Sequence, residues 1–460
     1  MKKFLYITLF AIANLSFGQY DLSFYQMGNA TPQHNNYNAA VFPKGKAFFS
    51  LPVISGVNTS VSLGFGMNDI LTKTGDSTLV DIDKFLAEQT EGTFMNYSFN
   101  PTIFMMGFRV GEKGFLTAFA NERMDFTMFY PLKMIQFAWN GNAEYVGENY
   151  VIDDFKYNFT AYHEYGIGYG HTFNIAGMNT TFGVRAKYLV GWAHAGIEED
   201  VSMNIYTADA TSENPYMMEV TLNSGKMVQA GFNQLESLQD DGAAIDYFIN
   251  NQNTGFGLDF GVDMDVTDRI SAGLAINDLG FIDWKDDSES VSFNGTSFTI
   301  EGSAFDDLDK LGETVQDSID NLEIDTAAAE FRTSLNSKVF LSGSYRVTDQ
   351  GYAMLTVSNF FNQGEMNSAL GVGYRQDFGN WFTFSLTGSY SKQFGPDFGA
   401  GLMLRGGFFQ LYTNVDNIMN TIDIPNAQGF NIKFGINFVF GKHGIPDKII
   451  KNPDDVDITY

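Results

Sequence analysis

The chain has 460 residues, no cysteine and a formal net charge of −27, with 54 acidic against 27 basic side chains. The acidity argues against nucleic acid as a partner, because phosphate binding needs a basic surface, and without cysteine there is neither a disulfide framework nor thiol chemistry. Outside the N-terminus no apolar run reaches the roughly 18 residues of a membrane helix. A chain with 47 glycines and 45 phenylalanines can still cross a membrane if its strands close into a barrel.

The first 44 residues contain two segments that differ in composition. Residues 1–18, MKKFLYITLFAIANLSFG, carry two lysines, a short apolar stretch and small residues at the end. This pattern predicts a secretory signal peptide cut before Gln19. Residues 19–44 are polar and lack a helix or strand period. We expect them to be either a disordered tail or a plug folded into the barrel, and their aromatic residues favour the plug.

Alternating segments follow, and each is typical of a strand with one apolar face. The clearest pair lies in 255–284, where a turn at Thr267 and Asp268 joins two alternating runs into a β-hairpin. The face opposite the apolar one is too small and too acidic for a protein core, so we expect lipid outside and a polar lumen inside. The strands predicted before and after this pair are 47–65, 94–110, 115–130, 157–173, 178–195, 338–348, 352–361, 369–378, 382–392, 398–404, 408–415 and 430–440.

Several charged and glycine residues fall on the predicted lumen face. Charged side chains facing lipid at mid-membrane would cost roughly 2–4 kcal/mol each, so the charged residues must point inward. The lumen-facing candidates for ligand binding are Arg185, Lys187, Asp259, Asp263 and Asp265. The alternative is a salt-bridged ladder that fills and stiffens the barrel, and this interpretation is favoured. Inward glycines such as Gly170 and Gly261 leave room for a plug or ligand, or permit strand curvature, and curvature is favoured.

Long connections are predicted at 67–93, 131–154, 196–254 and 286–335. The third contains a candidate hairpin (201–206 with 216–222) and a helical stretch at 234–250. In the fourth, apolar residues between Phe305 and Leu322 recur at helical spacing, which predicts an amphipathic helix on the barrel mouth.

Connection lengths set the predicted topology. Tight turns fall at 111–114, 174–177, 267–268, 349–351, 379–381 and 405–407, and short turns of such barrels lie in the periplasm. This gives an all-β fold, a 14-stranded antiparallel outer-membrane β-barrel over residues 45–441, with both termini periplasmic. Residues 442–460 form a periplasmic tail. The aromatic closing strand 430–440 suits delivery to the barrel-assembly machinery in the outer membrane.

Four segments carry a family resemblance: AYHEYGIGYG, GVRAKYLVGWA, the stretch 255–284 and FLSGSYRV. They resemble a Bacteroidota-type family of uncharacterised outer-membrane barrels. That family is similar to the long-chain fatty-acid transporter fold and to the PorV-like barrel of type IX secretion. The resemblance spans residues 42–441 and implies a fold but no catalytic residues. Tyr37-Asn38-Ala39-Ala40 departs from the Asn-Pro-Ala expected there.

The sequence offers little for catalysis or metal binding. None of the five histidines accompanies a Gly-x-Ser-x-Gly elbow, and no two are spaced as converging metal ligands. We therefore expect no enzyme, no cofactor and no metal. His163 and His171 share the outward face of their strand.

Two functions stay open. Passage or binding of hydrophobic small molecules predicts an apolar pocket beneath the N-terminal segment and a gap in the wall. A non-transporting interaction barrel, partnering a secretion or outer-membrane assembly complex, predicts a filled lumen and an apolar patch on the extracellular loops. A hydrolase would require a Ser/His/acid cluster at the rim.

Overall fold

A computed structural model shows a closed antiparallel barrel of 14 wall strands. It describes residues 21–51, 56–74, 77–89, 92–209, 217–237, 252–300, 325–362, 365–391, 395–419 and 427–441. Two wall strands are each built from two pieces, β1 (Ala47–Ser50) with β2 (Val57–Ser62) and β5 (Gly92–Phe99) with β6 (Thr102–Val110). The others are β7 (Gly114–Pro131), β8 (Asn149–Ile175), β9 (Met178–Thr207), β11 (Thr254–Asp265), β12 (Ile270–Trp284), β17 (Lys338–Thr348), β18 (Gly351–Asn362), β19 (Glu365–Phe378), β20 (Phe382–Ser391), β21 (Gly395–Gly406), β22 (Phe409–Asp416) and β23 (Gly429–Phe440).

Sequence neighbours pair around the wall, and the last strand closes it. β23 lies between β22 and the first strand, so that Phe438 pairs with Phe49 and Ile432 with Thr59. Elsewhere in the wall, β9 pairs directly with β11, and Asp259, for example, lies opposite Arg185. The predicted fold class and strand number are therefore confirmed.

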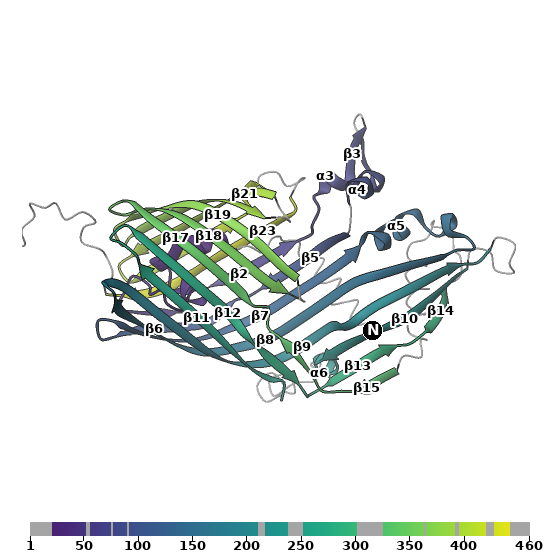
Figure 1. Ribbon diagram of the computed structural model, residues 1–460, viewed down its shortest axis with the longest axis horizontal. Coiled ribbons are helices and arrows are strands. Elements are labelled where there is room, and N and C mark those ends of the chain that lie inside the picture. The colour runs from purple at the N-terminus through teal and green to yellow at the C-terminus, as the bar shows by residue number, and fades with distance from the viewer. Residues whose placement is uncertain are drawn as a thin grey trace, which may run out of the picture.

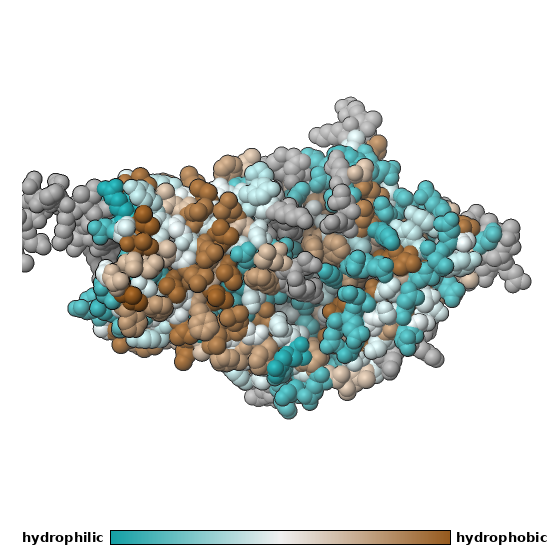
Figure 2. Space-filling view, in the orientation of Figure 1, coloured by the Kyte–Doolittle hydropathy of each residue, from teal (hydrophilic) through white to brown (hydrophobic). Residues whose placement is uncertain are grey.

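The exterior of the barrel is an apolar belt. Large apolar side chains on alternating positions are exposed, for example Ile167 at 67% and Tyr188 at 54% of their surface. Figure 2 shows apolar residues gathered over the barrel, whereas hydrophilic residues dominate the end that carries α5 and β10. A closed barrel with this exterior leaves no backbone group unpaired in lipid, and it is the architecture of an outer-membrane protein.

None of the described helices is long and apolar enough to cross a membrane.

The two ends of the barrel differ in their connections, as predicted. Tight turns join β6 to β7, β8 to β9, β11 to β12, β17 to β18, β19 to β20 and β21 to β22, and β23 ends beside the start of β1 at the same end. Gly111 and Gly177 have positive φ in two of these turns, where a residue with a Cβ would be strained. We call this the tight-turn end and the opposite one the long-loop end.

The first wall strand, predicted over 47–65 with a bend suggested by Pro52 and Gly56, consists of two pieces. β1 ends where Ser50 pairs with Asn437, and β2 begins where Val57 pairs with Phe434. These two pairings are seven positions apart in the first strand but only three positions apart in β23. Residues 52–55 lie outside the described part of the chain.

At the long-loop end, strands extend beyond the barrel as a curved sheet (Figure 1). The upper part of β9 pairs with β10 (Met218–Ala230), so Val220 faces Ile205, which confirms the hairpin expected in this insertion. The further elements at this end are α3 (Met67–Ile70), β3 (Leu71–Thr74), β4 (Ser77–Val80), α4 (Ile82–Glu88), α5 (Leu132–Asn140), η3 (Ala143–Tyr145), α6 (Phe232–Ser237), β13 (Ser288–Phe293), β14 (Thr296–Ile300), β15 (Asp325–Ala328) and β16 (Phe331–Ser334). The helix predicted between Phe305 and Leu322 and most of the one at 234–250 lie outside the described residues.

Residues 21–44 lie inside the barrel, where Figure 1 shows them as the purple helix among the strands. They form α2 (Leu22–Met27), η1 (Gly28–Ala30) and η2 (Pro32–Asn36). Every residue of α2 is buried, although the sequence has no amphipathic period, because the helix lies between the wall and the rest of the segment, where Phe24 packs on Tyr37 and Tyr25 on His34. We call residues 21–44 the luminal segment.

Candidate functional site

Glycines of the wall bring the luminal segment close to the strands. A Cβ at Gly183 would lie 2.1 Å from the carbonyl oxygen of Ala39, and one at Gly261 would lie 2.2 Å from Oδ1 of Asn38. At Gly170 a Cβ would meet the ring of Phe42 at 2.5 Å. Such distances are shorter than van der Waals contact, so only glycine fits. Gly170 and Gly261 therefore leave room for a plug, which is the alternative that the sequence did not favour.

Hydrogen bonds tie the luminal segment to strands on all sides of the lumen. Gln33 and Asn437 exchange two amide hydrogen bonds of 2.6 and 3.0 Å, and Nη1 of Arg375 donates to the carbonyl of Met27 at 2.9 Å. At the segment's start, the backbone N–H of Ser23 donates to Asp416 at 2.9 Å. At its end, Nζ of Lys44 forms an ion pair of 2.6 Å with Asp377. The remaining contacts include Asp21 with Lys433, Asn38 with Val262, and Tyr37 with Asn277.

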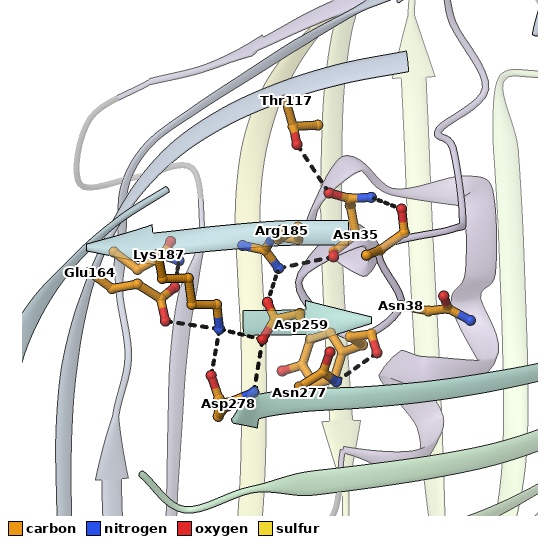
Figure 3. Close-up of polar contacts among 12 residues, drawn as sticks. Asn35, Asn38, Thr117, Glu164, Arg185, Lys187, Asp259, Asn277 and Asp278 are labelled. Atoms are coloured by element: carbon orange, nitrogen blue, oxygen red, sulfur yellow. Dashed lines mark hydrogen bonds and ion pairs between the residues drawn. The ribbon is translucent and has the colours of Figure 1, made fainter. Parts of the chain in front are cut away.

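A buried cluster of charges holds the middle of the segment (Figure 3). Nζ of Lys187 lies 2.8 Å from Asp259, 3.2 Å from Glu164 and 2.5 Å from Asp278. Nη1 of Arg185 lies 3.4 Å from Asp259 and donates to the carbonyl of Asn35 at 3.0 Å. Arg123 reaches Glu164 at 3.2 Å. We call these six side chains the luminal charge cluster.

Three of the five predicted lumen residues therefore meet in one place. Arg185, Lys187 and Asp259 belong to the luminal charge cluster, with at most 1% of each exposed. Asp263 and Asp265 lie further along β11 and line a separate cavity at the tight-turn end. The sequence analysis missed Arg123, Glu164 and Asp278 as cluster members. For Glu164 a signal existed, because it alternates with glycines on the inward face of its strand.

The luminal charge cluster is electrically balanced, with three cations and three carboxylates. Each charge has an opposite partner within 3.4 Å, which buried charges require. Balanced, mutually paired groups match the salt-bridged ladder of the sequence analysis. Ligand binding by these residues stays a prediction.

His34 is the titratable group of the luminal segment with the largest consequence for pH. It is 2% exposed, packs edge-on against Tyr25 and lines the tight-turn cavity. Burial lowers the pKa of His34 to about 3, and the positive charge of Arg375 adds to this effect. The imidazole is therefore neutral when the segment is docked.

Acidification is expected to loosen the luminal segment through His34. A released segment has the ordinary histidine pKa of about 6.5, so the docked state binds fewer protons. The contribution of His34 to the free energy of docking is fully present above a pH of about 6.5. It is lost as the pH falls toward 3, by up to about 1.4 kcal/mol per pH unit. This loosening is measured as the time for which single barrels conduct in planar bilayers, recorded from neutral to mildly acidic pH. His34→Asn is expected to remove that slope, and equal slopes in the two proteins would refute the role of His34.

Two cavities touch the luminal segment, and polar residues form the majority of the lining of each. The first, about 430 Å³, lies at the tight-turn end among Asp263, Ser342, Arg346 and Arg375. The second, about 40 Å³, lies behind Gly56 and Val57 and is lined by asparagines and by Arg123 and Lys338. The apolar pocket expected beneath the segment does not occur among the described residues. The physical reason is the polar lumen face, which offers amides and charges rather than apolar side chains.

A third cavity of about 450 Å³ lies at the long-loop end, above the luminal charge cluster. Tyr162, Phe331 and Leu335 line it together with Asp125 and Glu198, so its wall is part apolar and part acidic. Beneath it, Trp284 is completely buried, stacks on Phe331 with 6.0 Å between ring centroids and donates to Thr333 at 2.9 Å. Trp284 and Phe331 belong to an apolar cluster with Leu189, Ala230 and Ile282.

No arrangement for metal binding or hydrolysis stands out in the described part of the chain. Its residues include no group of three or more histidines and carboxylates placed to hold an ion. His163 pairs with Glu122 at 2.5 Å, and Nε1 of Trp192 donates to the same carboxylate at 2.6 Å. Glu122 and Trp192 point outward by strand alternation, as does His163, so this group sits on the outer surface of the wall.

The chain matches one family model and is similar to several solved structures. A model of a family of unknown function, DUF5723, matches residues 40–416, and no curated protein matches the sequence. Similar solved structures include a Pseudomonas aeruginosa FadL homologue (10% identity, TM-score 0.45, covering 93% of this chain and all of the other). The toluene transporter TbuX of Ralstonia pickettii shows 9% identity and a TM-score of 0.43, covering 91% and 98%. The translocator domain of autotransporter NalP from Neisseria meningitidis shows 8% and 0.31, covering 90% and 94%.

Proposed function

Starting from the premise that the chain belongs to the family of unknown function DUF5723, we propose that it is an outer-membrane barrel that binds small hydrophobic molecules at its long-loop end and lets them pass when the luminal segment moves. In this proposal the long-loop end is extracellular, because short turns of such barrels lie in the periplasm. The signal peptide is removed, and both termini are periplasmic. The proposal includes no catalytic step.

The observation that carries the proposal is the long-loop cavity. Its volume of about 450 Å³ falls within the range of roughly 300–1,000 Å³ that is usual for small-molecule sites. Phe331, Leu335 and Phe361 supply apolar surface, and a few polar groups such as Thr160 and Asn336 stand beside them. Burying an apolar ligand against such side chains is favourable by about 25 cal/mol per Å² of surface removed from water.

Passage beyond this cavity requires a rearrangement. The apolar cluster around Trp284 lies directly below the cavity, the luminal charge cluster comes next, and the luminal segment fills the space after that. A hydrophobic molecule would have to cross paired charges in this state. The segment is a separate piece of chain held by side-chain contacts, so its movement opens the lumen without breaking any strand pairing.

Quenching of Trp284 fluorescence by bromobenzene, with the protein in lipid nanodiscs, tests binding at the long-loop cavity. The protein used has its other three tryptophans, Trp139, Trp192 and Trp381, replaced by phenylalanine, and we expect saturable quenching that disappears when Trp284→Phe is added. Phe331→Ala removes one of the apolar side chains of the lining. Burying a phenylalanine fully is worth about 1.5–3 kcal/mol, so the affinity for bromobenzene is expected to fall about tenfold. Phe65→Ala serves as the matched control, because Phe65 packs on Phe85 at the same end, 5.4 Å away, and outside the cavity. Quenching that is not saturable, or that persists in Trp284→Phe, would refute the proposal.

The alternative is a non-transporting interaction barrel, and two observations favour it. The luminal segment fills the lumen, as that function requires. In addition, aromatic residues gather at the surface of the long-loop end: Tyr145 and Tyr150 lie 4.4 Å apart beside Phe137 of α5, and Trp139 is 45% exposed. Such a surface fits an extracellular or secretion-system protein partner. If the barrel binds no bromobenzene and stays closed without its segment, this alternative takes precedence.

A further inference from the structure

The cavity at the tight-turn end has walls of opposite charge. One wall is formed by β11 and β12, where Asp263 and Asp265 project inward beside Ser271. The other is formed by β17 and β19, where Arg346 and Arg375 project inward. The luminal segment forms the roof with Tyr25, His34 and Asn38, and turn residues such as Gln350 and Asn380 form the open rim.

Arg375 forms an ion pair of 3.3 Å with Asp377, which also lines the cavity, whereas the charges of Asp263, Asp265 and Arg346 do not neutralise each other. Among the described residues, no ion pair joins Asp263 or Asp265 to Arg346. Asp263 also forms no hydrogen bond with any described residue. Asp265 accepts only from the hydroxyl of Ser271, at 3.0 Å, and the guanidinium of Arg346 lies 5.7 Å from the ring of Tyr352. Separated charges of this kind differ from the luminal charge cluster, in which every group is paired.

Two buried side chains that line the same cavity have unused polar atoms. His34 is 2% and Arg375 is 6% exposed. Nδ1 of His34 and Nε of Arg375 have no hydrogen-bond partner within the described residues. Buried polar atoms are ordinarily satisfied by protein, water or ligand, so these two side chains keep unused hydrogen-bonding capacity beside the cavity.

The spacing of the charges indicates what fits between them. Asp265, Ser271 and Ser344 pair side by side on three adjacent strands, and Arg346 follows two residues further along β17. With about 4.8 Å between strands and about 3.4 Å per residue, the Cα atoms of Asp265 and Arg346 are about 12 Å apart. Three extended residues span about 10 Å, and charged ends of a ligand of that length reach both walls.

We propose that the tight-turn cavity is a binding site for a short zwitterionic peptide. The ammonium group of the peptide binds Asp263 and Asp265, and its carboxylate binds Arg346, whose planar guanidinium can hold a carboxylate through two hydrogen bonds. His34 and Arg375 supply hydrogen bonds to the peptide backbone from the roof and the far wall. This site lies at the opposite end of the barrel from the long-loop cavity and does not depend on the function proposed for it.

Calorimetric titration of the full-length barrel in nanodiscs with trialanine tests the site. N-acetyl-trialanine and trialanine amide are titrated in parallel, because each lacks one of the two charges. We expect trialanine to bind saturably and each capped peptide to bind about tenfold more weakly. Asp263→Asn with Asp265→Asn is expected to make trialanine bind as weakly as its acetylated form. Arg346→Gln is expected to make it bind as weakly as the amide.

Asp268→Asn and Arg269→Gln are the matched controls. Both residues are exposed in the turn between β11 and β12 and lie outside the cavity lining. Arg269→Gln changes the net charge of the barrel mouth as Arg346→Gln does, and Asp268→Asn changes it by half as much as the double aspartate variant, in both cases without touching the site. Both control variants are expected to bind trialanine with the affinity of the wild type. Equal affinity for all three peptides, no saturable binding of trialanine, or equal losses in the control variants would overturn the proposal. Heat-shifted gel migration of each variant shows that the barrel has folded.

Discussion

Replacing Gly183 and Gly261 together by alanine is expected to convert a closed barrel into a conducting one. The new Cβ atoms would lie 2.1 Å from the carbonyl oxygen of Ala39 and 2.2 Å from Oδ1 of Asn38, and the first of these is backbone, which has no rotamer to change. Since both strands are fixed by pairing on two sides, the luminal segment must give way. Single-channel conductance in planar bilayers measures the effect, with deletion of residues 19–44 as the reference for a fully open lumen.

The control for this prediction is Gly406→Ala, since nothing lies within 4 Å of a Cβ at that position. A second readout uses the cysteine-free sequence: Ser23→Cys, buried in the luminal segment, is expected to react with a maleimide only when the segment is displaced. A silent double variant together with a conducting deletion would show that the segment tolerates the added methyl groups. Silence of the deletion as well would show that wall side chains close the lumen, and the interaction barrel would then be favoured.

Lys187→Met is expected to be the most destabilising single substitution in the lumen. Nζ of Lys187 is the shared partner of Glu164, Asp259 and Asp278, so its removal leaves buried carboxylates with only Arg123 and Arg185 as counter-charges. Breaking a buried ion pair in this way costs about 3–5 kcal/mol. Urea unfolding in lipid vesicles, followed by the shift between folded and unfolded bands on gels, gives the change in unfolding free energy.

A matched lysine substitution separates the effect of burial from the loss of a charge. Lys226 forms an ion pair of 2.6 Å with Glu198 at the long-loop end, where the two side chains are 31% and 43% exposed. Solvent screens such a pair, so Lys226→Met is expected to change the free energy of unfolding by at most about 1 kcal/mol. Similar losses in the two variants would contradict the central position given to Lys187.

The order and number of wall strands followed from local sequence. A strand that faces lipid outside and a lumen inside must alternate at every position, so each strand carries its own signature. The tight turns are equally local, because only a few residues join the strands they connect. Arg185 and Lys187 could be assigned to the lumen on the same ground, since neither can face lipid at tolerable cost.

What the chain places inside the barrel was decided by tertiary structure. The luminal segment has no period, because a helix surrounded by wall has no solvent-facing side; its helix α2 is fixed by contacts with β19 to β22, more than 340 residues away in sequence. The grouping of Glu164 with Lys187 and Asp278 depends on the register of three strands, which alternation alone leaves open. The tight-turn cavity likewise depends on pairing, because β11 and β17 flank β12 in the wall and the luminal segment covers them. Sequence determined which way each side chain points, and pairing across the closed barrel determined which side chains meet.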